Sequence, residues 1–88
     1  MKSKEAQYIE LKESLERAAK LNDEKLLETL IINNRELINS IVNEYGPGNV
    51  FLLSPYDILY SNHNYKTSGL YQDLLEQINP MALLGEDE

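Results

Sequence analysis

The chain has 88 residues, of which 42% are hydrophobic and 26% charged, and its formal net charge is −7. A chain of this size buries roughly 60–65% of the surface that it exposes when unfolded, so these values predict one small globular domain with a modest core. The absence of cysteine excludes disulfides, cysteine-based zinc sites and thiol catalysis.

The negative charge is concentrated in the second half of the chain. Residues 1–21 carry five Lys or Arg and four Glu (net +1), residues 22–45 carry two and five (−3), and residues 46–88 carry one Lys and six acids (−5). An acidic surface repels a phosphate backbone, so direct nucleic-acid binding is disfavoured. We see no apolar core of a signal peptide and no run near the ~20 apolar residues of a membrane span, and we therefore expect a cytoplasmic protein that does not enter membranes.

The first predicted helix extends from about residue 3 to residue 21. Ser3 is its expected N-cap. Its apolar residues repeat at 3-4-3 spacing and form a narrow stripe on one side. They are Tyr8, Leu11, Leu15 and Ala18. A tight turn follows, with Asn22 as the candidate N-cap of the next helix.

The second predicted helix extends from residue 23 to about residue 45, where Gly46-Pro47-Gly48 stops it. Its apolar residues cover about 160° of the helix, whereas roughly 100° is typical of a surface helix. They are Leu26, Leu27, Leu30, Ile31, Leu37, Ile38, Ile41, Val42 and Tyr45. A face this wide has to be buried, either by the rest of this chain or by another chain.

The segment Asn33-Asn34-Arg35-Glu36 is open to two interpretations. Asn33 followed by Glu36 resembles a capping box, which predicts a break into two short helices. The apolar residues keep one phase across the segment, and for that reason we favour a continuous helix. Asn34 lies near the middle of the wide face, where it marks the break, fixes the register of a helix–helix interface or turns out to solvent.

Shorter elements are predicted beyond the glycines. Residues 49–53 form a strand or a buried loop, since so short an apolar run does not distinguish the two. Ser54 as cap and Pro55 as first helical residue predict a brief helix that ends near residue 61. Residues 62–67 have the composition of a loop.

The last predicted helix begins at Gly69, with Thr67 or Ser68 as its cap, and ends at Ile78. Residues 80–88 are expected to form a flexible acidic tail. The predicted fold of residues 1–88 is therefore a single all-α domain. In it, an antiparallel helical hairpin of residues 3–21 and 23–45 is closed by one or two short C-terminal helices.

No residue pattern predicts catalysis or a cofactor. His63 stands in an Asn-flanked loop with no His or Cys partner, so we interpret it as an exposed loop residue rather than a base or metal ligand. Glu10, Glu13 and Glu16 alternate with basic residues, which is typical of a solvated, salt-paired helix face. We therefore expect no enzyme activity, no cofactor, no metal and no small-molecule substrate.

Tyrosine is the dominant aromatic residue, with six Tyr against one Phe and no Trp. Tyr56, Tyr60, Tyr65 and Tyr71 fall within sixteen residues. A tyrosine ring with a polar tip suits a protein interface. It equally suits the boundary of a small helical core, and both interpretations stay open.

The wide face of the second helix leads to the functional hypothesis. The first helix supplies about five apolar residues to cover a face of nine, and the later segments supply about eight, so coverage within the chain is incomplete. We predict a small non-enzymatic protein–protein interaction module that forms a homodimer or docks on a protein partner. The residues predicted to bind the partner are Leu27, Ile31, Asn34, Ile38, Ile41, Tyr56 and Tyr60.

Two other hypotheses follow from the same residues. A small acidic inhibitor, of a type that some phages encode, would engage a basic or nucleic-acid-binding protein through its acidic C-terminal half, including Asp57, Asp73 and Glu76. A DNA-reading helix-turn-helix built on the possible break at Asn34 is the least favoured. Its reading helix, residues 35–45, carries one cation and two acids.

Overall fold

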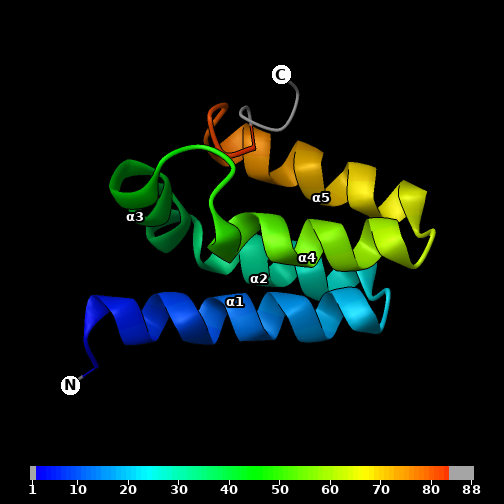
Figure 1. Ribbon diagram of the computed structural model, residues 1–88, viewed down its shortest axis with the longest axis horizontal. Coiled ribbons are helices and arrows are strands. Elements are labelled where there is room, and N and C mark those ends of the chain that lie inside the picture. Colours follow the sequence, from blue (N-terminus) through cyan, green and yellow to red (C-terminus); the bar gives the residue numbers. More distant parts are fainter. Residues whose placement is uncertain (1, 84–88) are drawn as a thin grey trace.

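The computed structural model describes residues 2–83, and within them every regular element is a helix (Figure 1). The helices are α1 (Lys4–Lys20), α2 (Glu24–Asn33), α3 (Arg35–Tyr45), α4 (Val50–Ser61) and α5 (Tyr65–Ile78). The all-α fold class is confirmed. None of these helices is both long and apolar enough to cross a lipid bilayer.

The helices pack so that α2 and α4 both lie between α1 and α5 (Figure 1). The helix α1 packs most extensively on α4, and α3 packs on α5 at one end of the molecule. The predicted hairpin of two long helices is not confirmed in this form, because the second helix is split and the main partner of α1 is α4. The two C-terminal helices are full elements of the bundle, longer than the brief helices predicted from the sequence.

The core is a cluster of buried side chains to which each of these helices contributes. Its largest fully buried members include Tyr8 and Leu15 from α1, Leu52 and Leu59 from α4, and Tyr71 from α5. The apolar stripes of α2 and α3 face into the same cluster. The remainder of the chain therefore covers most of the wide face that the sequence shows, while Leu26 and Tyr45 at its edges stay exposed.

The ends of α1 follow local capping rules. The Ser3 hydroxyl accepts a hydrogen bond from the Ala6 N–H (3.1 Å), as predicted. Asn22 lies just beyond the C-terminal end of α1 with a φ of 52°, a left-handed conformation in which Asn is tolerated. The N-cap of α2 is thus Asp23 rather than Asn22, and its carboxylate accepts a hydrogen bond from the Leu26 N–H (3.0 Å).

The prediction of one continuous second helix is wrong, because Asn34 interrupts it with φ −119° and ψ 24°. The Asn34 side-chain amide donates to the Leu30 carbonyl (2.8 Å), and its backbone N–H donates to the same carbonyl (3.1 Å). An asparagine side chain that competes for a backbone carbonyl ends a helix locally. The predicted capping box is not formed, since the N-cap position of α3 is Asn34 and its side chain caps no N–H there.

The helix α4 begins at Val50, so the interpretation of residues 49–53 as a strand or loop and of Ser54 as a cap is wrong. Asn49 is the cap, and its side chain accepts from the Leu52 N–H (3.3 Å). Pro55 lies inside the helix, where it has no N–H to donate to the Phe51 carbonyl. The Tyr71 hydroxyl of α5 donates to the adjacent Leu52 carbonyl (2.6 Å), which ties α5 to α4 beside the proline.

The helix α5 begins four residues earlier than predicted. Thr67 and Ser68 are buried inside it rather than capping it. The Thr67 hydroxyl donates to the Glu24 carboxylate of α2 (3.2 Å), and the Ser68 hydroxyl donates to the Tyr65 carbonyl (2.9 Å). Both polar side chains therefore have partners in the packed bundle.

The segment after α5 is part of the fold as far as residue 83. Ala82 and Leu83 are buried in the core, and the Gly48 N–H donates to the Ala82 carbonyl (2.8 Å). Ala82 and Leu83, which the sequence placed in a flexible tail, thus pack in the core, while Pro80 and Met81 before them are exposed. The acidic end of that predicted tail, Glu86-Asp87-Glu88, lies outside the described residues.

Candidate interaction surface

Four of the predicted partner-binding residues lie inside the molecule. Leu27, Ile31, Ile38 and Ile41 each have a side chain that is 0% exposed, and all four belong to the core cluster. They present no surface to a second chain in this fold. An interface centred on the stripe of the second helix would require the bundle to open.

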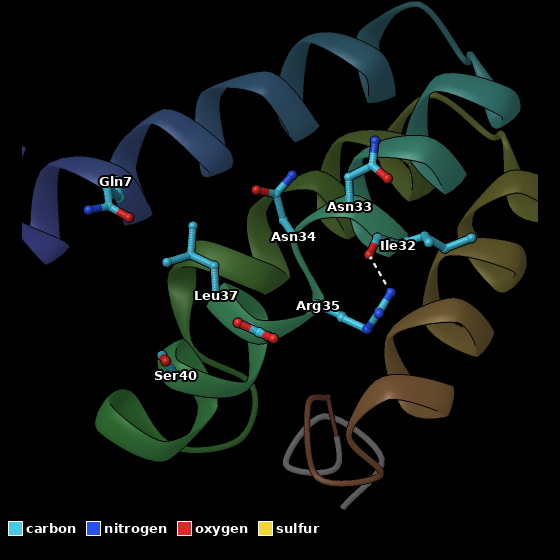
Figure 2. Close-up of a pocket in the computed structure, with 8 residues that line it drawn as sticks. Gln7, Ile32, Asn33, Asn34, Arg35, Leu37 and Ser40 are labelled. Carbon is cyan, nitrogen blue, oxygen red and sulfur yellow. Dashed lines mark hydrogen bonds between the residues drawn. The ribbon is translucent and has the colours of Figure 1, made fainter.

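Asn34 lies in an open groove between α1 and the junction of α2 with α3. The groove has a volume of about 610 Å³ and is lined mainly by amide, hydroxyl and charged side chains. Figure 2 shows Leu37 directed toward Gln7 of α1, while Arg35 extends to the opposite side and donates to the Ile32 carbonyl (3.3 Å).

The junction at Asn34 also bears on the helix-turn-helix hypothesis. A helix-turn-helix joins its helices by a turn of about three to four residues, whereas one residue separates α2 from α3. The helix α3 carries Arg35 against Glu36 and Glu44, so its charge does not favour DNA. The structure therefore adds nothing in support of DNA reading.

A second cluster gathers exposed rings at the end of α4 and the start of α5. We call Tyr56, Tyr60, His63 and Tyr65 the tyrosine surface. The Tyr56 and Tyr60 rings are stacked with centroids 6.0 Å apart, and Tyr60 meets Tyr65 edge-on at 4.9 Å. The His63 ring meets Tyr65 edge-on at 5.7 Å, and its Nδ1 forms a hydrogen bond with the Tyr65 hydroxyl (2.8 Å).

The turn between α4 and α5 holds these rings together. His63 has a φ of 63°, and its N–H donates to the Tyr60 carbonyl (3.0 Å) while the Asn64 N–H donates to the Leu59 carbonyl (2.9 Å). These two bonds make a Schellman motif, which closes α4 and reverses the chain within a few residues. Tyr65, the first residue of α5, is thereby placed against Tyr60, near the end of α4.

The tyrosine surface is open to solvent in the described structure. The Tyr60 side chain is 54% exposed and that of Tyr65 is 52% exposed, whereas Tyr56 is half-buried against the core. The sequence analysis named Tyr56 and Tyr60 as candidate binding residues but not Tyr65 and His63, which lie beside them in the structure. The crowding of tyrosines in this segment was the available signal, but Tyr71 from the same group is buried.

Burial and hydrogen bonding shift the pKa of several side chains in the packed bundle. Burial, together with the hydrogen bond from its hydroxyl to Glu44 (2.9 Å), raises the pKa of Tyr8. Burial raises the pKa of Tyr71 well above its ordinary value. Burial also acts to raise the pKa of Glu16, but hydrogen bonds from Ser54 and Lys12 lower it overall.

Acidic side chains flank the tyrosine surface. Asp57 is exposed on α4 next to Tyr56, and Asp73 is exposed on α5 two turns beyond Tyr65. Lys66 is the one Lys or Arg in residues 46–88. Within residues 2–83, no group of three or more His, Asp or Glu side chains is placed to hold a metal ion.

Gly69 lies one helical turn after Tyr65, on the same face of α5. A Cβ atom built on Gly69 would meet nothing within 4 Å, and the residue does not have a positive φ. Neither packing within the chain nor backbone conformation therefore requires glycine at this position.

Replacing Gly69 with alanine should stabilise the fold by about 0.5–1 kcal/mol, because glycine inside a helix costs about that much relative to alanine. Urea unfolding followed by circular dichroism measures the change. A loss of stability would show instead that the α5 backbone is closely packed at Gly69.

Comparison with models of known families, with curated proteins and with solved structures finds no match to this chain. The functional argument therefore rests on the residues of the tyrosine surface and on the charge of the elements that carry it.

Proposed function

We propose that the chain is a non-enzymatic interaction module that docks on a protein partner through the tyrosine surface, and that it acts in the cytoplasm. The observation that carries the proposal is that Tyr60 and Tyr65 expose more than half of their side chains while their rings pack against each other. Rings already held in place lose little conformational entropy when a partner covers them. Tyrosine is also enriched among the residues that dominate binding energy at protein interfaces.

The interface that we propose lies on the tyrosine surface, whereas the sequence analysis placed it mainly on the stripe of the second helix. Most of the stripe of the second helix is buried by the chain itself, and only Leu26 and Tyr45 of that stripe stay exposed, at 38% and 43%. Tyr56 and Tyr60 keep the role that the sequence predicted for them, with Tyr65 and His63 added. A second copy of the chain and a different protein are the two occupants that an experiment has to separate.

The test compares two variants of the full chain. The double variant Tyr60→Ala with Tyr65→Ala removes the exposed rings, and Ile9→Ala with Ile32→Ala removes two side chains of similar exposure, 44% and 45%, elsewhere. A partner captured from source cells, once purified, should bind the first variant at least ~30-fold more weakly and the second within about twofold of the native chain.

Sedimentation of the native chain at micromolar concentration decides whether the partner is a second copy. A dimer that the tyrosine variant dissociates would assign the surface to self-association. Circular dichroism must show that both variants keep the native helicity. Equal binding of the native chain and the tyrosine variant to the purified partner would contradict the proposal.

A further inference from the structure

We propose that the tyrosine surface, together with the adjoining face of α5, binds a positively charged polypeptide segment whose Arg or Lys side chains stack on Tyr60 and Tyr65 while its backbone passes over Gly69. This inference rests on the proposed function and adds the chemistry of the partner.

Charge is the first argument for a basic partner. Residues 46–83, which include α4 and α5, carry three acids (Asp57, Asp73 and Glu76) and one Lys (Lys66), for a net charge of −2, and three more acids follow in the chain outside the described residues. A second copy of the chain would bring the same acidic half against this one, and like charges across an interface oppose association. A segment rich in Arg or Lys instead finds exposed acids on both helices, Asp73 on the same face of α5 as Gly69 and Asp57 on α4, where it lines a hollow together with Lys20 of α1.

The rings supply the second argument. The face of a tyrosine ring attracts cations through its quadrupole, and the planar guanidinium of Arg stacks on it readily. The edge-on contact between Tyr60 and Tyr65, with an interplanar angle of 67°, directs the two ring faces differently. Two such surfaces can receive successive basic side chains from one extended segment.

Gly69 supplies the third argument, which is independent of charge. It is a glycine inside α5 that packing within the chain does not require, and the space above it is open. The missing side chain leaves room for another backbone to approach the helix closely. That room lies one turn from Tyr65 on the same helix face, so a segment stacked on Tyr65 can continue over Gly69.

The probe is a synthetic peptide of alternating Gly and Arg, titrated into the isotope-labelled chain and followed by NMR. A peptide with Gln in place of every Arg is the matched neutral probe. We expect saturable shift changes centred on Tyr60, Tyr65 and Gly69 with the Arg peptide and none with the Gln peptide. Raising the salt concentration from about 0.05 M to about 0.5 M should weaken binding by about tenfold or more.

A variant with added bulk tests the path of the backbone. Gly69→Leu adds bulk above a position where a Cβ atom meets nothing within 4 Å, and we expect it to weaken binding of the Arg peptide by about tenfold. Gln77→Leu places the same side chain at an exposed position of α5 two turns further along, and it should change binding by less than about twofold. If the two variants bind equally, the approach over Gly69 is overturned.

The remaining outcomes separate this inference from the proposed function. If the Gln peptide binds as well as the Arg peptide, or if neither binds while a protein partner still depends on Tyr60 and Tyr65, the basic segment is wrong and the interaction surface stands. If the Arg peptide causes shift changes at acidic residues all over the molecule, and if Tyr60→Ala does not weaken its binding, the inference fails. If, in addition, a purified partner binds the double variant Tyr60→Ala with Tyr65→Ala as tightly as the native chain, the proposed function fails as well.

Discussion

Replacing Ile38 with aspartate is expected to unfold the chain. Ile38 is 0% exposed in the core cluster, where α3 meets the rest of the bundle. Truncating such a side chain costs about 2–5 kcal/mol, and an unpaired carboxylate in its place adds several more. At roughly 0.05–0.15 kcal/mol per residue, the whole domain is stable by only about 4–13 kcal/mol. The loss is therefore comparable with the total stability.

Ile32→Asp is the matched control, because it makes the same substitution on a side chain that is 45% exposed. It should change the free energy of unfolding by less than about 1 kcal/mol. Circular dichroism and urea unfolding of both variants measure the difference. If Ile38→Asp keeps its helicity and loses only self-association, then Ile38 lies in an interface between chains, as the stripe of the second helix suggested.

The parts of the fold that the sequence predicted are those set by local rules. The apolar spacing of α1 and its Ser3 cap determine that helix within one segment of chain. The glycine after Tyr45 ends α3 with a φ of 86°, a conformation that favours glycine. Such signals need no knowledge of what packs nearby.

The break at Asn34 shows where local pattern is insufficient. The apolar residues of α2 and α3 face one core and so keep a phase that imitates a continuous helix. The break lies at Asn34, whose side-chain amide adds a second hydrogen bond to the Leu30 carbonyl beside that of its own backbone N–H. Sequence alone offered a different signal, the Asn33 to Glu36 capping box, and that box is not formed.

The second half was harder to predict because its helices depend on contacts between distant segments. Pro55 suggested a helix start, yet α4 begins five residues earlier and runs through the proline, with the Tyr71 hydroxyl on the neighbouring Leu52 carbonyl. The shorter predicted helices left part of the α2 and α3 stripe uncovered, and this is why the sequence placed an interface there. With α4 and α5 at full length, the centre of the stripe (Leu27, Ile31, Ile38 and Ile41) lies in the core.

Two residues of the tyrosine surface, Tyr56 and Tyr60, could be predicted from the sequence, whereas the position of Tyr65 depends on a turn between two helices. Tyr56 and Tyr60 are four residues apart, so they share a face of any helix that contains them. Tyr65 joins them through the turn, in which His63 takes a positive φ that histidine adopts more often than most side chains. Nothing in the spacing of residues 62–67 shows that turn.

Stability should fall steeply above about pH 10, and Tyr71→Phe should reduce that fall. The buried Tyr71 hydroxyl donates to the Leu52 carbonyl, an interaction that a phenolate cannot make, and burial raises its pKa well above the ordinary value. Because this pKa is higher in the folded chain, the unfolded chain loses the phenolic proton of Tyr71 at a lower pH than the folded chain does. The contribution of Tyr71 is therefore complete below about pH 10 and is lost as the pH rises further, by up to about 1.4 kcal/mol per pH unit.

Tyr71→Phe removes that proton together with the hydrogen bond. At neutral pH it should destabilise the fold by about 1–2 kcal/mol, because the Leu52 carbonyl loses a buried donor. Above about pH 10 the native chain should lose stability faster than the variant, so the gap between them narrows. Tyr60→Phe, on a residue that is 54% exposed, is the matched control for loss of a hydroxyl at neutral pH, where it should change the free energy of unfolding by less than about 0.5 kcal/mol. Urea unfolding measured at a series of pH values tests this. Parallel curves for the native chain and Tyr71→Phe would mean that the hydroxyl of Tyr71 does not hold α5 to α4.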